Sequence, residues 1–269
     1  MKRIFIALAV LACFSIADVA AQEREVAIVA HRGFWNCDQA GLAKNSIASL
    51  AQAQENDFWG SEFDVNMTKD GVLLVFHDRK INGKYIEKTR AKDLEYYRLS
   101  NGESIPTLDE YLELALKSPE TMLVFELKAH TTPKVETKAV KASIKALKKY
   151  DLFNPERVMF IAFSRHMCNE FARLAPGFTI QYLDNDADPD DLVKSGINGI
   201  DIHFKVLGRN PKMYERARAN GMSVNTWTVN KEEDIRKMIE LGVDQITTDN
   251  PLLVRQILQQ MGVKEKRAR

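Results

Sequence analysis

Residues 30–78 read AHRGFWNCDQAGLAKNSIASLAQAQENDFWGSEFDVNMTKDGVLLVFHD, and they place chemically active side chains where apolar runs end. The run Val26–Ala30 leads directly into His31-Arg32-Gly33, a second run ends in Glu62-Phe63-Asp64, and a third ends in His77-Asp78. In a parallel barrel the catalytic groups lie at the carboxyl ends of the strands. The stretch therefore predicts one site built from several strand ends.

Short β-rich apolar runs alternate with longer stretches of helical period, which is typical of a parallel α/β fold. The expected strands are Val26–Ala30, Gly60–Asp64, Thr121–Leu127, Val158–Phe163, Thr179–Leu183, Gly199–His203, Ser223–Thr228 and Gln245–Thr248. The expected helices are Asn45–Asn56, Thr107–Lys117, Thr132–Tyr150, Arg165–Leu174, Pro189–Lys194, Pro211–Asn220, Lys231–Leu241 and Pro251–Met261. Eight such units without a linker between them predict a single domain over residues 22–269, a closed (β/α)8 or TIM barrel.

One apolar run does not fit the alternation. Val72–Phe76 follows Val65–Thr68 across Lys69-Asp70-Gly71, and Asp-Gly between two apolar runs is a tight-hairpin signal. A hairpin strand is antiparallel, so it is not a barrel strand reached by a crossover. We therefore expect a β-hairpin above the C-terminal mouth of the barrel that brings His77 back to the height of Asp64.

Three further segments carry structural expectations. Mixed signals over Lys80–Glu103, with a short helical pattern at Lys92–Arg98, predict a short insertion at the mouth. The lysine-rich helix Thr132–Tyr150 has the alternation of a solvated outer barrel helix, although a basic amphipathic helix can also lie on anionic lipid. The basic tail Lys264–Arg269 is expected to be disordered.

The first residues, MKRIFIALAVLACFSIADVAAQ, have the charged, apolar and small-residue regions of a secretory signal peptide. We place the cleavage after Ala21, so that residues 1–21 are removed and the protein is exported, either periplasmic or secreted. Lipoprotein processing at Cys13 is the weaker alternative, because it leaves an apolar mature terminus. Only Cys37 and Cys168 lie beyond the cleavage site, so no disulfide framework holds the fold together.

Charge composition restricts the partners. The whole chain has 38 Lys and Arg against 37 Asp and Glu, and loss of Lys2, Arg3 and Asp18 with the leader makes the two numbers equal. A balanced charge argues against a nucleic-acid partner. Membrane contact is expected to be at most peripheral, and the composition leaves the oligomeric state open.

Glu62 and Asp64 are two positions apart on one strand, so their side chains share a face. Two converging carboxylates repel each other unless a cation lies between them. Glu126 ends the next long apolar run and faces inward by the same alternation. Three hard oxygen ligands from neighbouring strands suit one divalent cation, Ca²⁺ or Mg²⁺, rather than a structural zinc. The competing interpretation is an acidic rim neutralised by lysines and arginines.

The histidines and cations complete a hydrolytic set. His31 and His77 lie at strand ends beside the acidic residues, and imidazole titrates in the range that suits both a general base and a general acid. We favour His31 as the base and His77 as the acid. Arg32 and Lys128 supply positive charge for phosphate oxygens, although Lys128 can also simply pair with Glu126.

The later strands carry weaker signals. Asn225 and Trp227 share a strand face, and Trp227 either walls a substrate pocket or fills the barrel. Asp201 and His203 share the next face and are expected to be hydrogen-bonding rim or core residues.

This pattern resembles the glycerophosphodiester phosphodiesterase family over roughly residues 26–258. The resemblance rests on His31-Arg32-Gly33, Asn45-Ser46, Glu62-Phe63-Asp64-Val65, Thr68-Lys69-Asp70-Gly71, His77-Asp78, Ile105-Pro106-Thr107-Leu108, Glu126-Leu127-Lys128, Trp227 with Val229-Asn230, and Thr248-Asp249 before Pro251. It implies a (β/α)8 barrel that uses a divalent cation to hydrolyse glycerophosphodiesters to glycerol 3-phosphate and an alcohol. It implies the same metal ligands, histidine pair and phosphate contacts as above. Lys44 and Ala162 depart from the residues usual in the family, which affects fine positioning rather than the reaction class.

Three functions follow from these residues. The first is an exported metal-dependent phosphodiesterase in which the glycerol 2-hydroxyl or a water molecule attacks phosphorus. The second is a phospholipase D-like enzyme acting on lysophospholipid or sphingolipid. The third, a non-catalytic binding module, is disfavoured because such a module usually lacks a catalytic group, and here every group is present.

Overall fold

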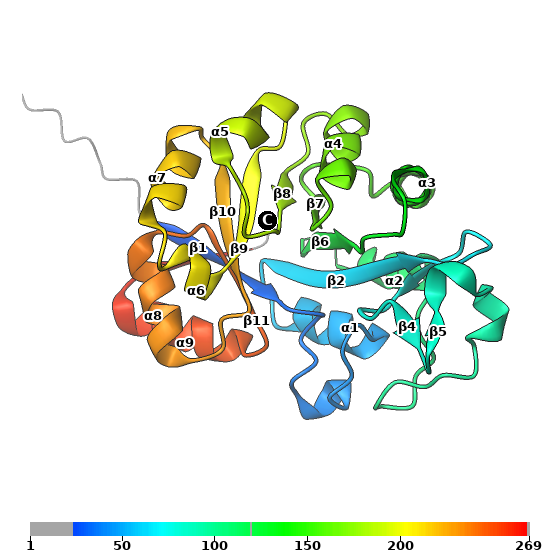
Figure 1. The fold of residues 1–269 in the computed structure, drawn as a ribbon. Helices are drawn as coiled ribbons and strands as arrows, with labels where there is room; N and C mark the ends of the chain where they lie inside the picture. Colours follow the sequence, from blue (N-terminus) through cyan, green and yellow to red (C-terminus); the bar gives the residue numbers. More distant parts are fainter. Residues whose placement is uncertain (1–23, 119, 268–269) are drawn as a thin grey trace, which may run out of the picture.

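A computed structural model describes residues 24–118 and 120–267, so the expected signal peptide, residues 1–21, lies outside the described residues. In the described part, eight parallel strands close into a barrel surrounded by helices (Figure 1). Closure occurs at β1, which pairs with β11 on one side and with β2 on the other. The predicted (β/α)8 barrel is therefore confirmed.

The barrel strands begin and end close to their predicted limits. They are β1 (Glu25–Ala30), β2 (Gly60–Met67), β6 (Met122–Leu127), β7 (Val158–Ala162), β8 (Ile180–Tyr182), β9 (Gly199–His203), β10 (Ser223–Trp227) and β11 (Gln245–Thr248). The largest difference is in β2, which continues past Asp64 to Met67 because the hairpin strand pairs with this extension.

The eight predicted helical segments are all helical, with shifts at their ends. The helices are α1 (Ile47–Glu55), α2 (Leu108–Ala115), α3 (Pro133–Lys149), α4 (Arg165–Leu174), α5 (Pro189–Leu192), α6 (Phe204–Leu207), α7 (Pro211–Ala219), α8 (Glu232–Leu241) and α9 (Pro251–Met261). The one-turn helix α6 has no counterpart in the prediction, because four residues are too few to show a helical period. In the described residues, no helix has both the length and the apolar character needed to cross a bilayer.

The predicted hairpin is confirmed. Strand β3 (Leu73–Val75) pairs antiparallel with the end of β2, with Val75 opposite Val65. The Phe76 N–H then donates to the Asp64 carbonyl over 2.9 Å, which brings His77 beside the acidic strand end. The insertion that follows contains β4 (Lys80–Ile81) and β5 (Lys84–Tyr85). The helix expected at Lys92–Arg98 is wrong, since only a 3-10 turn at Ala91–Asp93 forms there.

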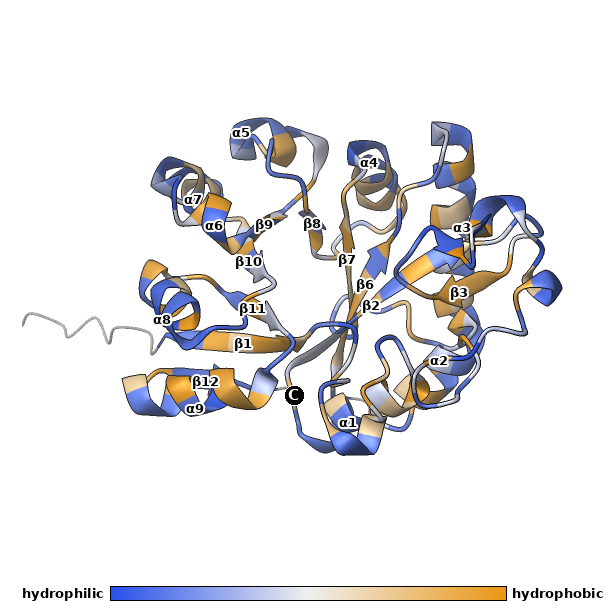
Figure 2. Ribbon diagram, turned by 60° about the horizontal axis from the view of Figure 1, so that its bottom comes forward, coloured by the Kyte–Doolittle hydropathy of each residue, from blue (hydrophilic) through white to orange (hydrophobic). Residues whose placement is uncertain are grey.

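Two apolar layers stabilise the barrel. The larger one lies between strands and helices, where Phe63, Phe125 and Phe160 are fully buried. The smaller one fills the barrel interior and includes Val29 and Ile161. Figure 2 shows β1 and β7 as largely apolar strands at the centre, with helices of mixed polarity around them. Removal of this apolar surface from water is the main stabilising contribution to the fold.

The prediction of a disordered tail is wrong for Lys264–Lys266. These residues form strand β12, which pairs in parallel with Glu25–Ala27 at the start of β1. Arg255 on α9 contacts Glu265 over 2.8 Å, and both side chains are mostly buried. The basic composition of the tail concealed this, because the pairing depends on the first residues of β1, which precede its pairing with β2, and on an arginine that lies on α9.

Candidate active site

The predicted acidic trio comes together at the mouth of the barrel. Glu62 and Asp64 face the interior from β2, and Glu126 is the register partner of Asp64 on β6. The three carboxylates each offer an oxygen within 4.8 Å of the others, and all three residues are buried. Among the described residues, Glu62 Oε1 has no hydrogen-bond partner. A buried carboxylate oxygen without a partner, beside two further carboxylates, fits a cation with hard oxygen ligands.

The pKa values of the trio reflect their crowding. Burial and the neighbouring Asp64 and Glu126 carboxylates raise the pKa of Glu62 well above its usual range. Burial and Asp64 raise the pKa of Glu126 to about 7. Burial opposes ionisation of Asp64 too, but the charges of Lys128, His77 and Arg32 and the Asn45 hydrogen bond together outweigh it and lower the pKa of Asp64 to about 2. The trio therefore carries a like-charge penalty that a divalent cation would remove.

The two predicted cations contact this trio. Lys128 Nζ lies 2.5 Å from Glu126 Oε1 and 3.1 Å from Asp64 Oδ1. Although burial alone would lower the pKa of Lys128, the two carboxylates raise it above its usual value. Arg32 Nε lies 3.6 Å from Asp64 Oδ2, and the Arg32 N–H donates to Glu62 Oε2 over 2.7 Å. Both cations therefore stay charged at the cavity that the carboxylates line.

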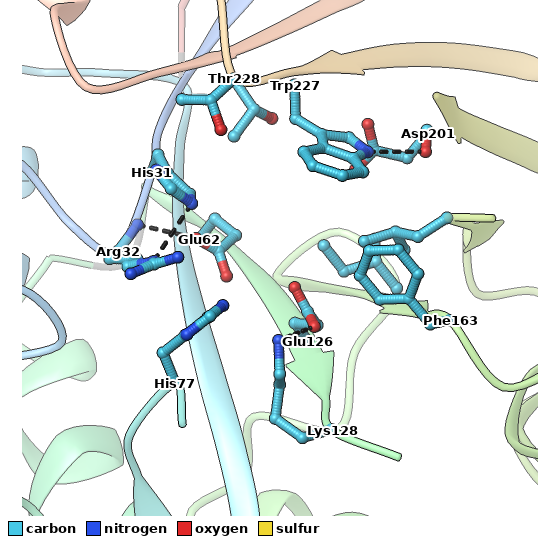
Figure 3. Close-up of a pocket in the computed structure, with 13 residues that line it drawn as sticks. His31, Arg32, Glu62, His77, Glu126, Lys128, Phe163, Asp201, Trp227 and Thr228 are labelled. Atoms are coloured by element: carbon cyan, nitrogen blue, oxygen red, sulfur yellow. Dashed lines mark hydrogen bonds and ion pairs between the residues drawn. The ribbon is translucent and has the colours of Figure 1, made fainter. Parts of the chain in front are cut away.

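Both histidines face the same cavity, and each has a carboxylate on Nδ1. His31 Nδ1 lies 2.8 Å from Asp249 Oδ1, and His77 Nδ1 lies 2.8 Å from Asp78 Oδ1. Arg32 Nε donates to His31 Nε2 over 3.2 Å, so that Nε2 is the accepting nitrogen. Burial lowers the pKa of His77. Figure 3 shows the two imidazoles approaching the cavity from one side, with Arg32 between them.

Asp249 is a site residue to which the sequence analysis gave no role. It follows β11 and is held by the Trp35 indole N–H over 3.0 Å and by Asn230 Nδ2 over 2.7 Å. Burial would raise the pKa of Asp249, but hydrogen bonding and charge at His31 outweigh burial and lower it to about 2. Its ionised carboxylate fixes the Nδ1–H tautomer of His31. The signal was present in the sequence, since Asp249 also follows a strand end.

Asn45 is a second site residue to which the sequence analysis gave no role. Its Nδ2 donates to Asp64 Oδ2 over 2.8 Å, and its Oδ1 accepts from the Asp64 N–H over 3.1 Å. Asn45 has φ of 57°, in the left-handed region that asparagine tolerates better than most residues. This backbone conformation turns the amide toward β2 and fixes the orientation of the Asp64 carboxylate.

A tight turn explains why glycine follows His31-Arg32 in the sequence. Gly33 has φ of +76°, and a Cβ placed on it would lie 2.7 Å from the Ser49 backbone carbon, where no side chain fits. The Gly33 N–H donates to the Glu62 carbonyl over 2.9 Å. Because the chain turns at Gly33 against α1, the preceding His31 and Arg32 remain at the mouth of the barrel.

The cavity enclosed by these groups has a volume of about 100 Å³ and two unlike halves. One half carries the carboxylates, histidines and cations described above. The other half is lined by Ile161, Phe163, Leu183 and Trp227. Trp227 donates its indole N–H to the Asp201 carbonyl over 3.0 Å and contacts Phe163 edge-on at 5.6 Å (Figure 3). Of its two predicted uses, Trp227 forms a wall of the cavity.

The other polar residues considered from the sequence, Asp201, His203 and the two cysteines, lie in different surroundings. Burial and the nearby Glu126 raise the pKa of Asp201, which lines the cavity, well above its usual range. His203 lies beside Trp227, with its ring centroid 5.3 Å from the indole. Cys37 and Cys168 are both free thiols and line no part of the cavity.

The closed barrel has an acidic trio, two cations and two histidines that each contact a carboxylate, all at its strand ends. These are the groups of a hydrolase acting on phosphate esters. The model of the glycerophosphoryl diester phosphodiesterase family matches residues 31–253. A glycerophosphodiester phosphodiesterase of Caldanaerobacter subterraneus is 31% identical over 240 residues, 83% of this chain and 94% of that relative. The chain belongs to this family and is a phosphodiesterase that hydrolyses glycerophosphodiesters.

Solved structures of similar proteins agree with this family assignment. A glycerophosphodiester phosphodiesterase from Parabacteroides distasonis is 40% identical, with a TM-score of 0.85 over 89% of this chain and 99% of that one. An Oleispira antarctica phosphodiesterase, solved in complex with the product sn-glycerol-3-phosphate, is 25% identical, with a TM-score of 0.74 over 87% of this chain and 96% of that one. The resemblance stated from the sequence motifs is confirmed.

The raised pKa of Glu126 predicts how stability depends on pH in the absence of metal. Between its ordinary value of 4.5 and about 7, the folded protein holds a proton that the unfolded chain has released. The free energy of unfolding of the chelator-treated protein should therefore fall as pH rises from 5 to 8, by on the order of 3 kcal/mol. Urea unfolding with EDTA measures this.

The matched control is Glu126→Gln, which lacks the titrating group and keeps the shape. His77, whose pKa is lowered by burial, acts in the opposite direction below its ordinary value of 6.5, but it does so in both proteins. The difference between the two pH profiles reports Glu126 together with its effect on the pKa of Glu62. Parallel profiles would contradict the crowding of charge inferred for the trio.

Proposed function

We propose that this protein is an exported, metal-dependent phosphodiesterase that produces glycerol 3-phosphate and an alcohol, with His31 and His77 as its acid/base pair. The observation that carries the proposal is that both histidines line the same cavity as the acidic trio, each with a carboxylate on Nδ1. The product bound by the Oleispira antarctica relative supports glycerol 3-phosphate as the product here.

His31 is the base of this pair. Asp249 accepts from Nδ1–H, so Nε2 is the nitrogen with the lone pair. When the phosphate takes over the Arg32 N–H that Nε2 now accepts, Nε2 takes a proton from the attacking hydroxyl or water. Asp249 then stabilises the imidazolium that forms. His77 is the acid, since a bound phosphate anion favours its protonated form and Asp78 supports the charge through Nδ1. His77 donates its proton to the departing alcohol oxygen.

Glu62, Asp64 and Glu126 would hold one divalent cation, Ca²⁺ or Mg²⁺. When bound, the cation neutralises phosphate charge and polarises the phosphoryl group. Arg32 and Lys128 contact the phosphate oxygens as negative charge develops in the transition state. Trp227 bounds the substrate on the side away from the histidines.

We predict that His31→Ala and His77→Ala each reduce kcat by about 10²–10⁴-fold, because each removes one proton-transfer group. Thermal unfolding should change little, since both imidazoles are partly exposed at the mouth. The control is His166→Ala, whose imidazole bonds Thr137 on the outer helices and lines no part of the cavity. Full activity in either test variant would exclude the acid/base assignment.

Substrate and metal are tested together with a panel of glycerophosphodiesters, measuring glycerol 3-phosphate release with Ca²⁺, Mg²⁺ or EDTA. We expect release to stop with EDTA and to return when excess cation is added. Lysophosphatidylcholine is the comparison substrate, and faster turnover of it than of glycerophosphocholine would favour the phospholipase D-like alternative. Release unaffected by EDTA would contradict the metal assignment, and a trapped cyclic phosphate would identify the glycerol 2-hydroxyl as the nucleophile.

Export is supported by the charge and hydropathy pattern of residues 1–21. We expect the exported protein to begin at Gln22, which mass spectrometry of the mature chain measures. A lipid mass on Cys13 together with globomycin sensitivity would instead establish lipoprotein processing.

A further inference from the structure

Asp201 is a buried carboxyl group in the catalytic cavity that the reaction assigned above does not use. It lies on β9 with 1% of its surface exposed, and it lines the apolar half of the cavity opposite Glu62 and the histidines (Figure 3). Its Oδ1 has no hydrogen-bond partner within the described chain. A buried acceptor left without a partner is unfavourable, so a ligand or water is expected to satisfy it.

Asn225 provides the complementary atom. It is the register partner of Asp201 on β10, faces the same interior and is fully buried. Its Oδ1 accepts from the Thr226 N–H over 2.8 Å and from the Thr247 hydroxyl over 3.1 Å. Because a backbone N–H can only donate, this contact fixes the orientation of the amide. Nδ2 is then a buried donor without a partner in the described residues.

The Asp201 acceptor and the Asn225 donor lie at paired positions of adjacent strands, and neither has a partner within the described chain. Together they match the hydrogen-bonding capacity of a hydroxyl group. A hydroxyl donates one hydrogen bond and accepts another, whereas an ammonium only donates and a trimethylammonium does neither. A carboxyl oxygen accepts in either protonation state, so the match does not depend on the charge of Asp201. The adjoining Ile161 and Leu183 provide apolar contact for carbon atoms.

The size of the cavity identifies which half of the substrate enters. The whole cavity, its charged half included, has a volume of about 100 Å³, so its apolar half admits a small polyol rather than a large alcohol group. The phosphodiester is next to the acidic trio in the proposed function, on which this inference rests. The glycerol unit is then the part that reaches β9 and β10.

We propose that Asp201 and Asn225 form a hydroxyl-binding subsite, in which Asp201 accepts from and Asn225 donates to a free hydroxyl of the glycerol unit. Asp201 is thereby a specificity-determining residue that selects glycerophosphodiesters over other phosphodiesters. Sites built to bond a substrate hydroxyl discriminate strongly against analogues that lack it, because the buried partners are then left unpaired.

The test compares glycerophosphocholine with 2-hydroxypropylphosphocholine, which has the same phosphodiester, headgroup and 2-hydroxyl but lacks the terminal glycerol hydroxyl. The wild type is expected to favour glycerophosphocholine by at least about 100-fold in kcat/KM. Asp201→Leu should reduce this ratio to below about tenfold. Asp201→Asn, whose amide oxygen still accepts, should retain most of the preference, and equal damage in both variants would overturn the subsite in favour of a purely electrostatic role.

Binding of sn-glycerol 3-phosphate and propyl phosphate, measured by calorimetry with the cation present, gives a readout independent of turnover. Asp201→Leu should weaken the first by about tenfold or more and leave the second unchanged. If this variant does not fold, Asn225→Ala serves for the same two comparisons; it removes the Nδ2 donor together with the Oδ1 that accepts from the Thr226 N–H and the Thr247 hydroxyl. An unchanged preference in a folded, active variant overturns the subsite. A wild type inactive on every glycerophosphodiester overturns the proposed function instead.

Discussion

Mutual repulsion among three buried carboxylates is the constraint on which the rest of the site depends. Glu62, Asp64 and Glu126 lie close together in a region from which water is largely excluded, where like charges interact strongly. The protein compensates part of this charge with Lys128 and Arg32, and it ties Asp64 to Asn45. The remaining negative charge is what would attract the divalent cation of the proposed function.

The backbone around the trio is shaped to bring these partners close. Arg32 and Asn45 both have positive φ, and the Asn45 N–H donates to the Arg32 carbonyl over 3.0 Å. Two residues in an unfavourable conformation thus support each other, and Gly33 provides the tight turn between them. Strain of this kind is common at functional sites, where the surrounding structure holds it in place.

Opposite sides of the barrel supply chemically different groups to the cavity. Strands β1, β2 and β6 supply the charged groups, while the opposite side supplies Phe163 after β7, Asp201 on β9 and Trp227 on β10. Asn225 is the buried register partner of Asp201. Such a division suits a substrate with an anionic centre and a small uncharged polyol, because each part meets its own chemical environment. The β2–β3 hairpin contributes His77 from outside the barrel, so the proposed acid belongs to a segment separate from the strands that hold the proposed base and the trio.

The sequence by itself determined the barrel and most of the catalytic set. Alternation along each strand decides which side chains face inward, and apolar runs show where strands end, so Glu62, Asp64, Glu126, His31 and Lys128 were predicted without coordinates. The hairpin followed from Asp-Gly between two apolar runs.

Only the tertiary structure decided which groups meet across the barrel. His31 and Asp249 are 218 positions apart, and their contact depends on ring closure between β1 and β11. The unpartnered atoms of Asp201 and Asn225, and the pairing of β12 with β1, likewise depend on strand register and on neighbours distant in the chain. Local pattern fixes the direction of a side chain, whereas its partner is fixed by closure of the barrel, which no local pattern encodes.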